Sequence, residues 1–230
     1  MQNSAPDGCS GAALSALGPS QRQADCTLDA LTVRLAPLLC DSEGRRRANG
    51  AEVAALLKEY AASEESWRRY AQFRDDTYSR HLIWRCGDFE MLLLCWNEGQ
   101  ASPIHDHAGQ QCWMAVLEGE LEEVHFNEVP DGSSVAGGSV ASLEAGRVKA
   151  FPSGGVAFID DDIALHLVRP TPGTRGVSLH LYSSPIDSCR VFCPETGKPT
   201  AIRAGYHTVR GVPAEGADPD AIRAAWSSAT

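Results

Sequence analysis

Short apolar segments separated by glycine and proline turns fill the chain from Tyr78 onward, and this pattern constrains the fold most. The stretch YSRHLIWRCGDFEMLLLCWNEG predicts two strands around a turn at Cys86-Gly87-Asp88. Further strands are predicted in WMAVLEGELEEVHFNEV, SLEAGRVKAFPSGGVAFIDDDIALHLVRP, GTRGVSLHLYSSP and, last, IRAGYHTV. Many short strands with such turns favour a small β-barrel or a β-sandwich.

Residues 26–75 show the spacing of helices instead. A helix opens at Thr27-Leu28-Asp29 and carries leucines at helical intervals, and a second follows Gly50 in AEVAALLKEYAAS. Ser63 is expected to cap a third helix in SEESWRRYAQF, since acids follow it in the first turn. We therefore expect a mainly β fold, a small barrel over residues 78–210, with an N-terminal helical layer over 26–75.

The two ends of the chain show little periodicity. Residues 1–25 are rich in Gly, Ser, Ala and Gln and are expected to form a disordered leader, and residues 211–230 are expected to be a tail. Residues 26–210 are expected to form a single domain, which is an ordinary size for a chain of 230 residues.

The charge and the cysteines narrow the possible partners. A net charge of −10 disfavours nucleic acid and anionic membranes, because both attract basic patches. The sequence has neither an apolar run of membrane-spanning length nor a secretory signal, so a cytoplasmic protein is expected. Its 8 cysteines form no C-x-x-C pair and are expected to be free thiols. A monomer is expected, because no apolar helix face is left over.

His105 and His107 lie two residues apart in a strand-like run. Residues i and i+2 of a strand face the same way, so both imidazoles can reach one metal ion. Taken alone, such a pair is more often two surface histidines near a turn.

A second polar pattern occurs in Ser178-Leu179-His180-Leu181-Tyr182. The polar residues share one strand face and the leucines share the other, so the polar face either lines a functional site or belongs to an ordinary half-exposed strand. Arg80, next to Tyr78, offers a fork that can bind a carboxylate, although a lone arginine is more often a surface charge.

Two spaced motifs resemble those of the cupin superfamily, small β-barrels with a metal in the mouth. They are Gly99-x5-His105-x-His107, with Cys112 and Gly119 following, and Gly146-x5-Pro152-x-Gly154, with His166 following. The common cupin pattern has a glutamate ligand where Cys112 falls, so this resemblance implies three ligands: His105, His107 and His166. Imidazoles suit Fe, Zn, Cu and Ni alike.

Three neutral imidazoles leave the metal charge uncompensated, which favours a substrate that brings its own anion, such as a thiolate. Asp106 lies between His105 and His107 and should face the other way, so it is a poor candidate for a missing ligand. Asp160-Asp161-Asp162 are expected to be solvated charges in a turn.

Over roughly residues 52–207 the chain resembles the cysteine dioxygenase family, the thiol dioxygenase branch of the cupins. The matching segments are EYAASEESWRRYAQF, YSRHL, LCWNEGQASPIHDH, GELEE, IDDDIALHLV, SLHLYSSPIDSC and AGYHT. The resemblance implies one Fe(II) per chain on the three histidines, with L-cysteine chelating through its thiolate and amine and with O2 as co-substrate. It implies that Arg80 and Tyr78 hold the substrate carboxylate and that Trp96 forms a pocket wall. It further implies that Tyr182 lies beside O2, oriented by His180, which Ser178 orients in turn.

The implied reaction converts L-cysteine and O2 to cysteine sulfinic acid, a step of cysteine catabolism and taurine biosynthesis. A dioxygenase for 3-mercaptopropionate is the nearest alternative, but the resemblance implies Gln where Arg80 lies in such relatives. A cysteamine dioxygenase would need no carboxylate-binding residue, so Arg80 counts against it as well. A metal-binding cupin without turnover and a zinc or nickel isomerase remain as alternatives from other classes.

Cys112 and Tyr182 occupy the positions that are joined by a thioether in animal members of the family, so the resemblance implies this crosslink as a protein-derived cofactor. The family commonly reads Tyr-Ser-Pro-Pro, whereas this chain reads Tyr182-Ser183-Ser184-Pro185. A cis bond between two serines would cost about 3 kcal/mol. The turn that follows Tyr182 is therefore expected to be trans or strained.

Overall fold

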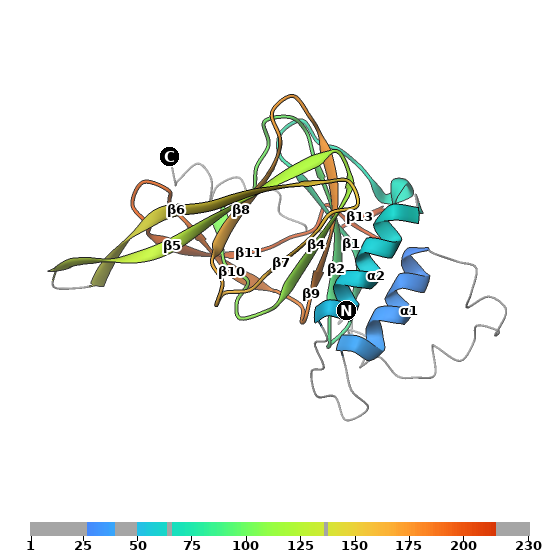
Figure 1. Ribbon diagram of the computed structural model, residues 1–230, viewed down its shortest axis with the longest axis horizontal. Coiled ribbons are helices and arrows are strands. Elements are labelled where there is room, and N and C mark those ends of the chain that lie inside the picture. Colours follow the sequence, from blue (N-terminus) through green and yellow to red (C-terminus); the bar gives the residue numbers. More distant parts are fainter. Residues whose placement is uncertain (1–26, 40–49, 64–65, 136–137, 215–230) are drawn as a thin grey trace.

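A computed structural model describes residues 27–39, 50–63, 66–135 and 138–214, without side chains for residues 130–141. The expected leader, residues 1–25, and most of the expected tail lie outside these ranges. Within them, two helices and a 3-10 turn precede thirteen strands arranged in two sheets (Figure 1). None of the helices described is both long and apolar enough to cross a membrane.

The helical layer consists of α1 (Leu28–Leu39), α2 (Gly50–Ser63) and the 3-10 turn η1 (Ser66–Tyr70). Thr27 caps α1, since its Oγ1 accepts a hydrogen bond from the Ala30 N–H at 3.2 Å. Of the expected third helix, the described residues form only η1, which is shorter than expected, and Ser63 is the last residue of α2.

One sheet has seven strands in the order β13-β12-β1-β2-β9-β4-β7. These strands are β1 (Ser79–Arg85), β2 (Glu90–Trp96), β4 (Cys112–Glu118), β7 (Val156–Ile159), β9 (Gly176–Tyr182), β12 (Thr208–Val209) and β13 (Val212–Pro213). The turn expected at residues 86–88 joins β1 and β2, and the Cys86 N–H donates to Phe89 O across it at 3.1 Å. β13 lies within the expected tail and pairs with β12.

The other sheet has six strands in the order β11-β10-β3-β8-β5-β6. These strands are β3 (Ile104–His105), β5 (Glu120–Val135), β6 (Gly138–Pro152), β8 (Leu165–Pro170), β10 (Ser188–Phe192) and β11 (Pro199–Arg203). The hairpin of β5 and β6 extends away from the rest of the molecule (Figure 1). The mainly β fold with a helical layer is confirmed, but the two sheets do not close into one barrel.

The strands β2, β4 and β9 are buried on both faces, and this explains their nearly continuous apolar sequences. One face packs under the helices, where Leu93, Leu179 and Leu181 meet residues of α1 and α2. The opposite face holds Leu92, Met114 and Tyr182 in a second core between the sheets. The two leucines of β9 therefore point toward the helices, and its polar residues point between the sheets.

The last strand expected from the sequence, IRAGYHTV, is broken. β11 ends at Arg203 and β12 begins at Thr208, and residues 204–207 cross from one sheet to the other. The N–H of His207 donates to the carbonyl of Arg80 at 2.8 Å, so this connection lies against the start of β1.

Candidate metal centre and its surroundings

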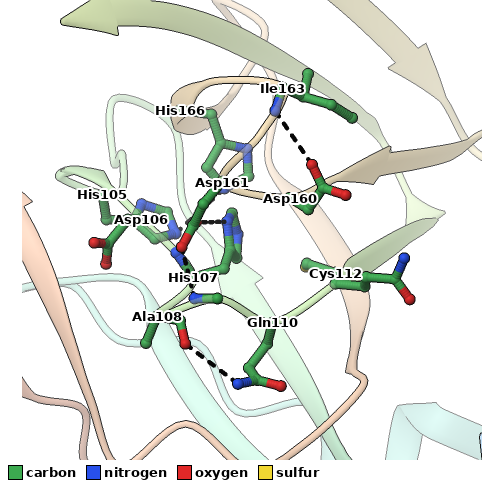
Figure 2. Close-up of polar contacts among 12 residues, drawn as sticks. His105, Asp106, His107, Ala108, Gln110, Cys112, Asp160, Asp161, Ile163 and His166 are labelled. Carbon is green, nitrogen blue, oxygen red and sulfur yellow. Dashed lines mark hydrogen bonds and ion pairs between the residues drawn. The ribbon is translucent and has the colours of Figure 1, made fainter. Parts of the chain in front are cut away.

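The three histidines expected to bind metal lie together in the structure. His105 of β3 is the direct cross-strand partner of His166 of β8, and His107 follows just after β3. One ring nitrogen from each residue lies within 4.8 Å of the other two. Figure 2 shows the three rings turned toward one another. Cross-strand pairing thus joins residues that are 61 positions apart in the sequence.

Hydrogen bonds fix which nitrogen of His105 and His166 faces inward. The Nδ1–H of His105 donates to Pro103 O, and the Nδ1–H of His166 donates to Glu123 Oε1, each at 2.9 Å. With protons on Nδ1, both Nε2 atoms carry lone pairs, and these atoms lie 3.2 Å apart. Two facing lone pairs repel unless a cation lies beside them, so the donor set fits a metal ion.

His107 supports the same interpretation. It is 1% exposed, and neither of its ring nitrogens has a hydrogen-bond partner among the described residues. Buried polar atoms are seldom left in this state. Its Nδ1 lies 3.6 Å from Asp161 Oδ1, which leaves Nε2 for the shared site. The three-histidine cluster could therefore bind a metal ion.

Burial keeps two of these imidazoles neutral, as metal ligation requires. Burial, reinforced by the neighbouring His107, lowers the pKa of His105 to about 3. Burial and the neighbouring histidines also hold the pKa of His166 well below its usual value. Both rings therefore keep a free lone pair at neutral pH.

The aspartates near the cluster behave differently from one another. Asp106 faces away, as expected, and its carboxylate accepts from the backbone N–H of Arg190 at 2.8 Å and pairs with the Arg190 guanidinium. Asp161 was expected to be a solvated charge, and this is wrong. Its carboxylate accepts the backbone N–H groups of His107 and Gly109 at 2.7 Å and 2.6 Å, so it holds the loop that carries His107.

Arg80 lies beside the cluster, at a small pocket that it lines together with Tyr78, His105 and Cys189. Its Nε–H donates to Gly205 O at 3.2 Å, which fixes the plane of the guanidinium. Burial raises the pKa of Tyr78, although the nearby Arg80 opposes this, so the phenol stays protonated at neutral pH. This pocket thus combines a fixed cation with a histidine of the cluster.

Trp96 supports this wall from behind. Its ring stacks on Tyr78 with centroids 4.5 Å apart, and its Nε1–H donates to Ser178 Oγ at 2.9 Å. The Ser178 hydroxyl is in turn 2.9 Å from His180 Nε2. The polar face of β9 is therefore a buried hydrogen-bonded line and not a half-exposed surface.

The resemblance implies that His180 orients Tyr182, but His180 points toward Cys112 instead. His180 Nδ1 lies 4.0 Å from Cys112 Sγ, while His180 and Tyr182 have ring centroids 6.3 Å apart and share no hydrogen bond. Cys112 and Tyr182 are direct cross-strand partners on β4 and β9. Burial raises the pKa of both groups, so thiol and phenol are protonated at neutral pH. The bond between Ser183 and Ser184 is trans, since the described residues contain no cis peptide bond.

Sequence reasoning missed Glu123 and Glu90. Glu123 is 3% exposed and binds both His166 and His125, with Oε2 3.1 Å from His125 Nε2. An acid on the same strand face as the apolar Leu121 was an available signal for it. Glu90 is 1% exposed and precedes the apolar run of β2, where the sequence offers no sign of its partners.

The family model and the sequence relatives agree on one family. A family model described as cysteine dioxygenase type I matches residues 24–194. Cysteine dioxygenase type 1 of Rattus norvegicus is 35% identical over 166 residues, which are 71% of this chain and 80% of the relative. The Homo sapiens protein of the same name is 34% identical over the same shares. A solved structure from Klebsiella pneumoniae, an uncharacterized conserved protein with a double-stranded beta-helix domain, aligns with a TM-score of 0.41 at 15% identity over 62% of this chain and 92% of that chain.

Proposed function

The chain belongs to the cysteine dioxygenase type I family and is an enzyme that oxidises cysteine, and on this premise we propose that the three-histidine cluster and Arg80 form its active site. The proposed reaction adds both atoms of O2 to the sulfur of L-cysteine and gives cysteine sulfinic acid. No reductant is needed, because the four electrons that O2 accepts come from the sulfur.

The family implies non-haem iron, and His105, His107 and His166 would hold it. The supporting observation is the set of inward nitrogens, which have no other use in the described structure. Bound Fe(II), one per chain, would supply the redox-active Lewis acid at which thiol and O2 react. The three histidines are neutral ligands, which suits a substrate that arrives as a thiolate.

Arg80 is proposed to bind the carboxylate of the substrate. It lines the same small pocket as His105, and its guanidinium plane is fixed by Gly205. An arginine fork recognises a carboxylate through two parallel hydrogen bonds, so it would orient the amino acid while the thiol end lies toward the histidines. Tyr78 would assist from its position in the stacked Tyr78–Trp96 pair, which holds its ring in place.

Tyr182 is proposed to act as a hydrogen-bond donor toward the co-substrate. It is 6% exposed, and its ring centroid lies 6.3 Å from that of His107, so the phenol borders the metal-binding cluster. Burial holds its pKa well above the usual value, so its proton is retained. Ser178 and His180 would hold this side of the site in place through their 2.9 Å contact.

A thioether between Cys112 and Tyr182 is proposed as a protein-derived cofactor. The support is their direct pairing on neighbouring strands, which brings the two Cβ atoms to about 5 Å. The crosslink would fix the phenol, whose strand continues into the Ser183 turn. The Ser183 N–H donates to Gln111 O at 2.9 Å, so Cys112 and Tyr182 are also tied through the residues beside them.

Oxygen uptake by iron-loaded protein tests this function. L-cysteine, 3-mercaptopropionate and cysteamine are compared side by side, and the products are identified by mass spectrometry. We expect the highest kcat/KM with L-cysteine and its sulfinic acid as product. Uptake without sulfinate, or a preference for cysteamine, which has no carboxylate, would contradict the proposed site.

A further inference from the structure

Glu90 is a buried carboxylate that the proposed reaction does not use. It is 1% exposed at the first position of β2, opposite Tyr182 in the pairing with β9. Its Oε1 accepts the hydroxyl of Tyr206 at 2.6 Å, and its Oε2 accepts the N–H of Ile186 at 3.2 Å. A carboxylate in such a position is retained only when its partners compensate the loss of water.

Arg85 completes this cluster from the solvent side. Its Nη1 donates to the Tyr206 hydroxyl at 2.6 Å and lies 3.3 Å from Glu90 Oε2, and its Nη2 pairs with Asp187. The Tyr206 hydroxyl therefore accepts from Arg85 and donates to Glu90, which leaves it one orientation. The ring of Tyr206 packs against the core between the sheets. Its position is thus fixed at both ends of the side chain.

The neighbours of Tyr206 in the sequence hold Arg80 on both sides. The carbonyl of Gly205 accepts the Nε–H of Arg80 at 3.2 Å. His207 binds the backbone of Arg80 twice, through its Nδ1 at 3.0 Å and its N–H at 2.8 Å. These three residues belong to the break between β11 and β12, which has no strand pairing of its own to hold it. Tyr206 lies beyond residues 24–194, the range that the family model matches.

We propose that Glu90 and Tyr206 are positioning residues for Arg80: their hydrogen bond fixes the segment 205–207, and that segment sets the plane of the guanidinium. The inference rests on the proposed role of Arg80 as the carboxylate-binding residue. It adds a determinant of substrate affinity that lies outside the pocket and touches neither substrate nor metal.

The charges agree with this geometry. Burial works against the charged form of Arg80, but the neighbouring Tyr182, Tyr78 and Glu90 raise its pKa overall. Glu90 is the carboxylate among these three neighbours. Its negative charge therefore favours the charged form of the buried guanidinium.

Two conservative variants test the proposal. Tyr206→Phe removes only the hydroxyl and keeps the ring in the core. Glu90→Gln keeps an acceptor for Tyr206, but its amide NH2 cannot accept from Arg85 or Ile186. Tyr60→Phe is the matched control, because it also removes a buried hydroxyl, which lies 3.0 Å from Ser66 Oγ in the helical layer. Arg80→Gln is measured in parallel.

The measurement is the dissociation constant of L-cysteine and of cysteamine for the anaerobic, iron-loaded protein, by calorimetry, with KM and kcat alongside. We expect Tyr206→Phe to weaken L-cysteine binding about tenfold, because it removes the hydrogen bond from Tyr206 to Glu90 that holds the segment behind Arg80. The effect on kcat should be smaller. Glu90→Gln should also weaken L-cysteine binding. Cysteamine binding should stay within about twofold for both, since cysteamine lacks the group that Arg80 binds. Tyr60→Phe should match the unaltered protein.

Three outcomes would overturn the inference. If Arg80→Gln weakens L-cysteine binding and Tyr206→Phe does not, the positioning role is wrong and the carboxylate site stands. If Tyr206→Phe weakens both thiols equally, its role is only structural. If Arg80→Gln changes neither thiol, the carboxylate site itself is wrong, and this inference fails with it.

Discussion

At the scale of single residues, each histidine of the metal-binding cluster is oriented by a residue that contacts the outer side of its ring. Pro103, Asp161 and Glu123 contact the outward sides of His105, His107 and His166, so the inward nitrogens converge. The spacing of His105 and His107 was readable from the sequence because it is local. The partners of Glu123 and Asp161 were not readable, because they are set by strand register and by a loop; for Glu123 the sequence indicates at most its burial, since it shares a strand face with Leu121.

Arg80→Gln is expected to raise the KM for L-cysteine about 10- to 100-fold, because a bidentate charged contact is lost. The rate with cysteamine, which has no carboxylate, should change little, so the preference should shift toward cysteamine. Steady-state kinetics with all three thiols measures this. A substrate profile equal to that of the unaltered protein would remove Arg80 from the carboxylate role.

The proposed bond between Cys112 and Tyr182 predicts a protein that is lighter by two hydrogen atoms after turnover with cysteine and O2. Intact-mass analysis and a crosslinked peptide would report it. Cys112→Ser provides the control, since it cannot form a thioether and should show no such loss of mass. An unaltered mass with no crosslinked peptide in the active protein would refute the bond.

At the scale of elements, the strands were predictable where their sequence is periodic and bounded by turns. The β1–β2 hairpin and the two-faced pattern of β9 follow from the sequence for this reason. The segment IRAGYHTV was read as one strand because its apolar and aromatic residues favour one. Its centre instead passes Arg80 and Glu90, and these contacts come from residues more than 100 positions away.

The turn between β4 and β5 depends on Gly119, one of the motif glycines. Its φ is +76°, and an added Cβ would lie 2.1 Å from the carbonyl oxygen of Arg175. Gly154 has a similar φ of +83°, but a Cβ added there would have nothing within 4 Å, so it is the matched control.

Gly154→Ala should therefore lower the free energy of unfolding by about 1–2 kcal/mol through backbone strain alone. Gly119→Ala should lower it by at least about 2 kcal/mol more, because the Arg175 backbone must also move. Urea denaturation of both variants provides the comparison. Equal losses would show that the contact with Arg175 does not limit the turn.

At the scale of the whole molecule, the helical layer and the two sheets divide the core in two, and the site lies between the sheets. The sequence indicated the helices and the β class, since both depend on local period. It could not indicate that the sheets stay open, because this depends on how edge strands far apart in sequence meet. The register that pairs His105 with His166 is non-local for the same reason.

Acid should destabilise the fold partly through His81, which is buried between Thr208 and Ser79, with ring nitrogens 2.9 Å from each hydroxyl. Burial lowers its pKa in the native state to about 4 from 6.5. Between these values the unfolded chain binds more protons than the native state, so stability falls as the pH falls through this window. The midpoint urea concentration of the unaltered protein should decrease from pH 7 to pH 4.5. In the His81→Gln variant the decrease over the same pH range should be smaller. A decrease of the same size in both proteins would exclude His81 as a contributor.

The metal content of the purified protein tests the central claim most directly. Elemental analysis after anaerobic loading with Fe(II) and desalting should find close to one iron per chain. His166→Ala should lose most of it, because two imidazoles hold a metal poorly, whereas Tyr60→Phe should retain it. Full iron retention in His166→Ala would contradict the three-histidine site, whatever activity the protein shows.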